Sequence, residues 1–458
     1  MRPRQLGLTL LVTALVAAAC SSEAAQRSSP ASSPGSRAAH PAVPTTGEPP
    51  SASPNASIEL PAASPDAWLV VGRRNQAGLD VILASSGEQL YDLPVGIPSP
   101  DWGQVLSATV SGGSTTVRRL AVQPGFGGDA ITIPGAWQLP AIGLDALPGG
   151  VSLDGTTIAL VARTDGSGGT AQTSRFAILS AVLDRQPKVI ELAGSFAYDT
   201  LSPDGATLYV IEHLPAPPTG HYQVRAVDVA SGLLRDGVVV DKTNLSEAMG
   251  GYPISQLSLA SGRVLTLYQG AEHPFVHALD TIQGWAVCID LPAGRAGIGA
   301  AAARTAEDWG LAASPDGGMV FAVNATLGLV ESIDPAGPVL RSGATVEPLA
   351  GLDIVEAKFG HQPGGPAARR VVVTPDGRTI LAAGSAGIMA IDAASLRVTN
   401  RYLVGKAVDA VAVTPDGGTI FALLRQGGRI VRLAATSGTV QATVSGTDYD
   451  RLLGVIPW

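Results

Sequence analysis

The chain has 458 residues, with 30 Lys or Arg against 38 Asp or Glu and a net charge of −8 at pH 7. An acidic chain of this kind lacks the clustered basic residues that neutralise phosphates, which argues against a nucleic-acid partner. Hydrophobic residues make up 45% of the chain, enough for a large core, so global disorder is excluded. Two cysteines cannot build a disulfide framework.

Residues 1–19 have the pattern of a signal peptide. Arg2 and Arg4 give a positive start, and the apolar stretch 6–18 is too short to span a bilayer. Three alanines then precede Cys20, an arrangement that resembles the lipobox of bacterial lipoproteins, with Ala17 where that family usually has Leu. The resemblance implies export and acylation of Cys20, which would anchor the protein to the outer face of the bacterial cytoplasmic membrane. An ordinary secretory signal cleaved near Ala19 is the alternative.

Residues 20–63 are predicted to form a tether. From residue 21 onwards about three-quarters of them are Ser, Ala, Pro, Gly or Thr, without apolar periodicity. Such a segment cannot bury enough surface to offset its ordering entropy, so we expect it to be disordered. As a flexible coil it would reach about 35 Å.

One turn motif recurs from residue 64 to the C-terminus, with starts 40 to 60 residues apart. Pro presets φ at the second turn position, Asp accepts hydrogen bonds from turn amides, and Gly takes the left-handed φ that closes a hairpin. The copies are Ser99-Pro100-Asp101, Ser152-Leu153-Asp154-Gly155, Ser202-Pro203-Asp204-Gly205, the degenerate Ser258-Leu259-Ala260-Ser261-Gly262, Ser314-Pro315-Asp316-Gly317, Thr374-Pro375-Asp376-Gly377 and Thr414-Pro415-Asp416-Gly417. We interpret their Asp residues as turn formers rather than ligands.

A second motif follows each turn by about 18 residues: an apolar strand that ends in Asp, then a polar turn. Its copies are Val227-Asp228, Leu279-Asp280, Ile333-Asp334 and Ile391-Asp392, with Leu183-Asp184 a looser case. Two turns in fixed phase give four short strands per unit, A to D, which is typical of a β-propeller. A β-sandwich or an array of hairpins is the alternative.

Both motifs together resemble the YVTN-type and WD-type repeats of bacterial extracytoplasmic β-propellers, over residues 64–458. The sequence therefore predicts an all-β propeller of four-stranded antiparallel blades. The motifs give eight blades, because strands 68–71, 81–84 and 89–93 form a further blade that lacks its innermost strand. The C-terminal stretch 452–457 is predicted to supply that strand and close the ring. Seven blades is the alternative count.

The A–B and C–D turns of a propeller lie on one face, and the B–C and D–A loops on the other. Extra length falls in the second set, at 213–221, 241–253, 293–309 and 345–369. Long loops on the rim of a rigid ring are where ligand sites usually form. The candidate ligand residues on this rim are Asp241, Glu272, His273, Glu307, Asp308, Glu356 and His361.

For the remaining reactive residues, two histidines and a cysteine, we prefer a structural interpretation to a functional one. His273 and His277 share one side of an extended segment some 13 Å apart, so we interpret them as solvated histidines rather than metal ligands. Cys288 lies in an apolar D strand, which favours a buried inert thiol over a nucleophile. We expect no catalytic set, no cofactor and no resident metal.

Two functions remain open. The preferred one is a monomeric, membrane-anchored binding or scaffold module that presents its rim to a protein, a peptide or an envelope component. The alternative is a lactonase-like propeller hydrolase with a cation at the tunnel mouth, which needs carboxylates such as Asp241, Glu307, Asp308 and Glu356 to converge. The fold alone does not choose between them.

Overall fold

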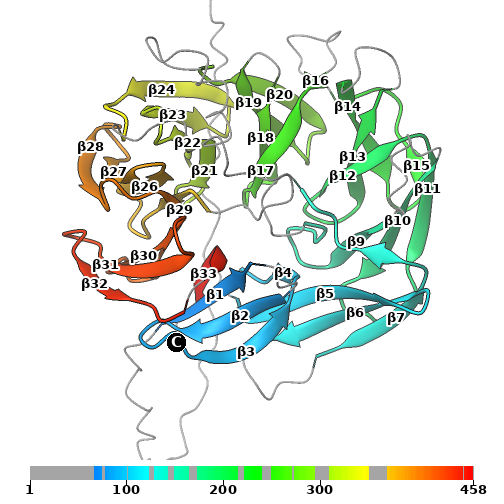
Figure 1. The fold of residues 1–458 in the computed structure, drawn as a ribbon. Coiled ribbons are helices and arrows are strands. Elements are labelled where there is room, and N and C mark those ends of the chain that lie inside the picture. The colour runs from blue at the N-terminus through cyan, green and yellow to red at the C-terminus, as the bar shows by residue number, and fades with distance from the viewer. Residues whose placement is uncertain are drawn as a thin grey trace, which may run out of the picture. The chain divides into compact units, whose positions relative to one another are not determined.

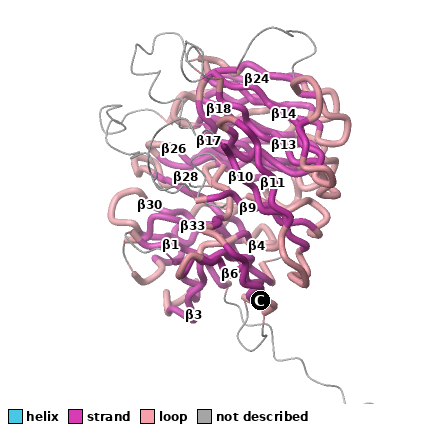
Figure 2. The backbone as a smooth tube through the Cα atoms, turned by 90° about the vertical axis from the view of Figure 1, so that its right-hand side faces the viewer, coloured by secondary structure: helices cyan, strands magenta, loops and turns pink. Residues whose placement is uncertain are grey.

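The computed structural model of the chain describes residues 67–74, 78–100, 102–122, 128–142, 149–163, 173–214, 221–239, 249–270, 273–293, 309–349, 369–446 and 448–456. The signal peptide, Cys20 and the tether lie outside these residues. All secondary structure in the described part is β-strand, as Figure 2 shows. That part contains no helix with the length and apolar character that a membrane crossing requires.

The strands form eight antiparallel sheets arranged in a ring (Figure 1), which confirms the predicted β-propeller. Each sheet is a path of four strands, and we number these blades from the N-terminus. Blade 1 contains β33 (Tyr449–Ile456), β1 (Trp68–Arg73), β2 (Gly78–Leu83) and β3 (Gln89–Pro94), and blade 2 contains β4 (Ile97–Pro98), β5 (Gln104–Ser111), β6 (Ser114–Ala121) and β7 (Ala130–Pro134). Blade 3 contains β8 (Trp137–Gln138), β9 (Thr157–Ala162), β10 (Thr173–Ser180) and β11 (Lys188–Ala193). Blade 4 contains β12 (Phe196–Leu201), β13 (Thr207–His213), β14 (His221–Asp228) and β15 (Leu233–Leu234), with a short extra strand, β16 (Met249–Gly250), beside β14.

The second half of the ring has the same plan. Blade 5 contains β17 (Tyr252–Ser258), β18 (Arg263–Gln269), β19 (Pro274–Asp280) and β20 (Trp285–Asp290), and blade 6 contains β21 (Trp309–Ala313), β22 (Val320–Asn324), β23 (Leu329–Asp334) and β24 (Val339–Thr345). Blade 7 contains β25 (Val371–Val373), β26 (Thr379–Gly384), β27 (Gly387–Asp392) and β28 (Val398–Tyr402). Blade 8 contains β29 (Val408–Val413), β30 (Thr419–Leu424), β31 (Arg429–Ala434) and β32 (Val440–Thr443).

The C-terminal strand closes the ring. β33 pairs with β1 in antiparallel register, with Trp68 opposite Ile456 and Leu69 opposite Val455. The first blade therefore combines the start and the end of the described chain, as predicted, and the count is eight rather than seven. This pairing covers the edge of β1, which would otherwise offer free backbone groups to another chain.

Burial changes in a regular way across each blade. The middle strands are the most buried, as in β19, where all seven residues are buried, whereas the outermost strand β24 is mostly exposed. The core lies between adjacent blades, where side chains such as Leu265 and Val276 of blade 5 pack in one cluster with Trp309 and Val320 of blade 6. Strands buried on both faces explain the low charge and high apolar content of the chain.

The Asp residues of the repeated turn are turn formers, as predicted. In the blade 4 turn, Ser202 Oγ donates to Asp204 Oδ1 at 2.6 Å, and the Ala206 amide donates to the same oxygen at 3.0 Å. The Thr207 amide donates to Ser202 Oγ at 2.9 Å, and Gly205 has a φ of 68°. Four further turns repeat this pattern, at Asp154, Asp316, Asp376 and Asp416.

Candidate functional site

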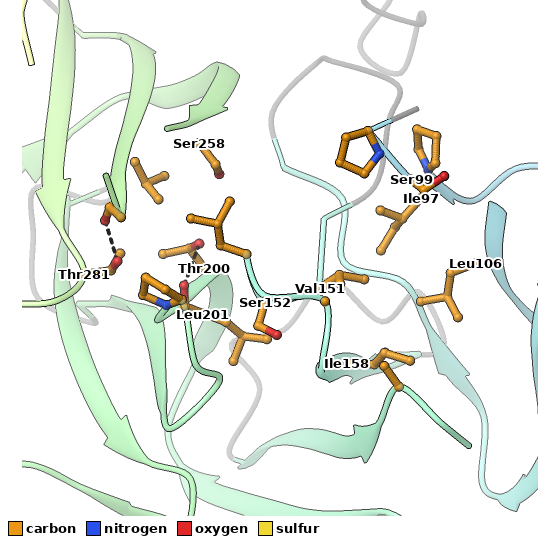
Figure 3. A pocket seen from close by; sticks show the side chains of 18 of the residues that line it. Ile97, Ser99, Leu106, Val151, Ser152, Ile158, Thr200, Leu201, Ser258 and Thr281 are labelled. Atoms are coloured by element: carbon orange, nitrogen blue, oxygen red, sulfur yellow. Dashed lines mark hydrogen bonds between the residues drawn. The ribbon is translucent and has the colours of Figure 1, made fainter. Parts of the chain in front are cut away.

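A cavity of about 490 Å³ lies at the turn end of blades 2 to 5. Its walls come from the turns between the first two strands of each blade and from turns after the third strands, including Ala181 and Thr281. Figure 3 shows Ile97 and Ser99 of blade 2 on one side, Ser258 and Thr281 of blade 5 on the other, and Val151 and Ser152 of blade 3 between them. Four blades thus contribute to one hollow.

The innermost strands are short or interrupted in two of the blades that line the cavity. The innermost strands of blades 2 and 3, β4 and β8, have two residues each, whereas β12 and β29 have six. Pro98 and Pro100, both in the cavity wall, cannot donate to a strand ladder. In blade 3 the innermost strand is interrupted after β8 and then pairs with β9 again, through the bridge between Val151 and Ile158 and the bond from the Ala159 amide to the Gly150 carbonyl.

The lining is mainly apolar, with one charge. Leu106, Ile158 and Leu201 line the cavity deep among the strands, and Leu153 lines it with 47% of its surface exposed. Among the described residues of the wall, Arg119 is the one charged side chain, and its guanidinium donates to the carbonyl of Ala181. This hydrogen bond ties blade 2 to blade 3 and holds the guanidinium beside the cavity.

Two serine hydroxyls of the wall hold their own turns together. Ser99 Oγ accepts the Gln104 amide at 2.9 Å, and Ser152 Oγ both accepts the Thr157 amide at 2.9 Å and donates to Asp154 Oδ1 at 2.6 Å. These bonds fix the turns, so the cavity has preorganised walls. Its described walls combine apolar surface, rigid turn backbone and the Arg119 cation.

A buried carboxylic acid lies beside this cavity. Asp199 on β12 precedes the wall residue Thr200 and is 2% exposed, and burial raises the pKa of Asp199 to about 7. Gln256 Nε2 on β17 donates to Asp199 Oδ1 at 3.1 Å and to Thr266 Oγ1 at 3.0 Å. Asp199 Oδ2 has no hydrogen-bond partner among the described residues. Sequence reasoning missed this residue, because a lone Asp in a strand looks solvated until its neighbouring blade is known.

Most of the predicted rim residues cannot be placed. Asp241, Glu272, Glu307, Asp308, Glu356 and His361 lie outside the described residues. His273 is described, and its Nδ1 lies 3.8 Å from Asp290 Oδ1 on the same blade. Within the ranges given above, no group of three or more His, Cys, Asp or Glu side chains could hold a metal ion. The ligand site on the rim and the cation-dependent hydrolase both remain predictions.

His277 corrects one sequence interpretation. It was expected to be solvated, but it is 2% exposed on β19, because the third strand of a blade is covered by its neighbours on both faces. Its ring makes an edge contact with Tyr268 at 6.3 Å between centroids. Cys288 lies on β20, the fourth strand, as predicted, and is half-buried rather than fully buried.

The sequence offered only an indirect signal for the cavity. The stretch between the start of β8 and the start of β9 is long, from Trp137 to Thr157, yet contains few strand formers. The short or interrupted first strands of two adjacent blades are the sequence feature that lies nearest to the cavity. The turn face had been interpreted as structural, and the cavity shows that this face also offers a ligand-sized space.

Comparisons with known proteins support the fold and indicate no particular function. No family model and no curated protein matches the chain. Apo AztD from Citrobacter koseri is similar in structure, with 13% identity, a TM-score of 0.50 and coverage of 85% of this chain and 98% of that one. The dihydro-heme d1 dehydrogenase NirN, in complex with DHE, has 14% identity, a TM-score of 0.50 and coverage of 86% and 76%.

A third solved structure, the periplasmic gluconolactonase PpgL of Pseudomonas aeruginosa, has 18% identity and a TM-score of 0.42, and covers 85% of this chain and 98% of that one. At such identities the likenesses to AztD and NirN show the propeller fold alone.

Proposed function

We propose that this chain is an exported binding module, held at the outer face of the cytoplasmic membrane by an acylated Cys20, that takes a small amphiphilic ligand into the cavity of blades 2 to 5. The observation that carries the proposal is the cavity itself, at about 490 Å³. Sites for small molecules are concave, mostly apolar, usually preformed and about 300–1,000 Å³ in volume. The cavity meets each of these criteria.

The lining defines the chemistry of the ligand. Leu106, Ile158 and Leu201 offer apolar surface to an aliphatic or aromatic body. Arg119, the one charge among the described wall residues, would pair with a carboxylate or another anionic group on that body. An amphiphile with one anionic end therefore fits better than a sugar or a cation.

The rim remains the second half of the proposal. The loops at 241–253, 293–309 and 345–369 would present a surface to a protein, a peptide or an envelope component, on the face opposite the cavity. A rigid ring with a ligand site on one face and long loops on the other suits a receptor-like module. The lactonase-like hydrolase has no comparable support.

Dodecanoate is a suitable probe for the cavity, with dodecanol as its neutral counterpart. Isothermal titration of the unlipidated full chain carrying Cys20→Ser should give saturable binding of dodecanoate. Arg119→Gln should weaken dodecanoate binding by about tenfold or more and leave dodecanol binding nearly unchanged, because a hydrogen bond to a charged group is lost. Arg118→Gln is the matched control, since Arg118 is exposed and does not line the cavity.

Substitutions at the mouth of the cavity test whether the ligand binds there. Leu153→Asp should reduce binding of both probes, whereas Val182→Asp should not, because Val182 is 65% exposed and lies outside the wall. Absence of saturable binding, or equal binding by wild type and Leu153→Asp, would exclude this function for the cavity.

A further inference from the structure

Two sulfur atoms meet at the interface between blades 4 and 5. Cys288 Sγ lies 3.6 Å from Met249 Sδ, although the two residues are 39 positions apart in sequence. Met249 belongs to β16, which pairs with β14 of blade 4, and Cys288 belongs to β20 of blade 5. The two blades thus each contribute one sulfur to the same point.

A histidine lies next to this pair in the sheet register. His277 on β19 is directly opposite Cys288 on β20. Directly opposite residues of an antiparallel pair point to the same face, with Cβ atoms about 4.5–5.5 Å apart. His277 is buried, so its imidazole lies within the protein beside Cys288 rather than in solvent.

The surroundings of the two sulfurs are apolar. Cys288 and Met249 pack against a buried cluster of Ile211, Tyr222, Tyr268 and Phe275. The rings of Tyr222 and Tyr268 stack at 5.4 Å across the blade interface. Both of their hydroxyls are buried.

We propose that Cys288, Met249 and His277 form a binding site for Cu(I). Thiolate and thioether sulfurs are soft ligands that select Cu(I), and imidazole also suits copper. With metal–sulfur bonds of about 2.3 Å, as in zinc–thiolate sites, two sulfurs 3.6 Å apart subtend an angle of about 100° at the ion. That angle suits three- or four-coordinate geometry and leaves room for the imidazole.

The bond-making step is simple. The Cys288 thiol loses its proton to solvent as the sulfur–copper bond forms, and copper stays in the cuprous state, so no electron is transferred. Binding therefore releases one proton, and affinity rises with pH. The sequence had indicated no resident metal, because Met249 and Cys288 come together only when two blades pack.

Titration with Cu(I) tests the site. The full chain carrying Cys20→Ser has Cys288 as its sole thiol, since the sequence holds two cysteines. Under anaerobic conditions, competition against a chromogenic Cu(I) chelator should show one copper per chain. Cys288→Ser should abolish stoichiometric binding, and Met249→Leu should weaken it by on the order of tenfold, since Leu keeps the volume but not the sulfur.

Met319→Leu is the matched control, because Met319 packs between blades elsewhere in the ring and should leave copper binding unchanged. Thermal unfolding of each variant separates loss of the site from loss of the fold. Copper K-edge absorption should show two sulfur neighbours at about 2.3 Å and one imidazole.

The proposal fails if the folded protein binds no Cu(I), if Cys288→Ser binds as well as its parent, or if absorption shows a single sulfur neighbour. Two sulfurs without an imidazole would overturn the assignment of His277.

Discussion

Gln256 and Asp199 join blades 4 and 5 near the centre of the ring, with Gln256 Nε2 donating to Asp199 Oδ1 at 3.1 Å. The other carboxyl oxygen of Asp199 is buried and has no partner in the part of the chain that the structure describes. This geometry suits a protonated acid, since one oxygen accepts the amide and the other can carry the proton. Burial accordingly raises the pKa of Asp199 to about 7, against 3.8 for an ordinary Asp.

The first prediction concerns this raised pKa. Between about pH 4 and pH 7 the folded protein retains the proton of Asp199 while the unfolded chain has lost it, so stability falls as pH rises through that window. Asp199→Asn keeps the acceptor for Gln256 and removes the titration. The melting temperature of the variant should match wild type near pH 4 and exceed it near pH 8. Parallel pH profiles for the two proteins would contradict the assignment.

The second prediction concerns the repeated turns. Asp204 accepts hydrogen bonds from Ser202 and from the Ala206 amide, and these bonds hold the pKa of the Asp204 carboxyl below its usual value. Asp204→Ala should lower the free energy of unfolding by about 1 kcal/mol, the usual net contribution of a lost hydrogen bond. Chemical denaturation measures the change. Asp236→Ala, at an exposed position outside the repeated turn, should have a smaller effect.

The turn chemistry explains how much of the fold the sequence could predict. In Ser314-Pro315-Asp316-Gly317 each residue acts on its own turn, so strand boundaries, blade order and blade number follow from local rules. Ring closure was also predictable, because a blade without its first strand required the C-terminal stretch.

Interactions between blades were not predictable in this way. Asp199 meets Gln256, and Cys288 meets Met249, through the packing of adjacent sheets. No motif spacing records such contacts. His277 was misjudged for the same reason, since burial of a third strand depends on the blade beside it. The cavity likewise combines turns from four blades, which no single motif records.

The third prediction concerns the membrane anchor. If Cys20 is acylated, the mature protein should remain in the membrane fraction, and mass spectrometry should find its N-terminus at a lipid-modified Cys20. Cys20→Ser should release a soluble protein, because the acyl chains supply the membrane affinity at about 0.8 kcal/mol per buried methylene. Equal release of variant and wild type would instead support the ordinary secretory signal cleaved near Ala19.

The fourth prediction concerns the closing strand. Gly454 on β33 faces the Trp102 side chain of blade 2, and a Cβ at that position would lie 2.7 Å from the indole nitrogen. Gly454→Ala must therefore displace a large buried side chain, and we expect a loss of about 1–3 kcal/mol in the free energy of unfolding. Because β33 covers the edge of β1, partial opening of this strand should also promote aggregation on heating.

Gly337→Ala is the matched control for this substitution, since a Cβ there meets nothing within 4 Å. Denaturant unfolding of both variants, with light scattering during a thermal ramp, distinguishes the two positions. Equal stability of Gly454→Ala and Gly337→Ala would mean that Trp102 can move without cost, and that the junction between the first and second blades is looser than their packing indicates.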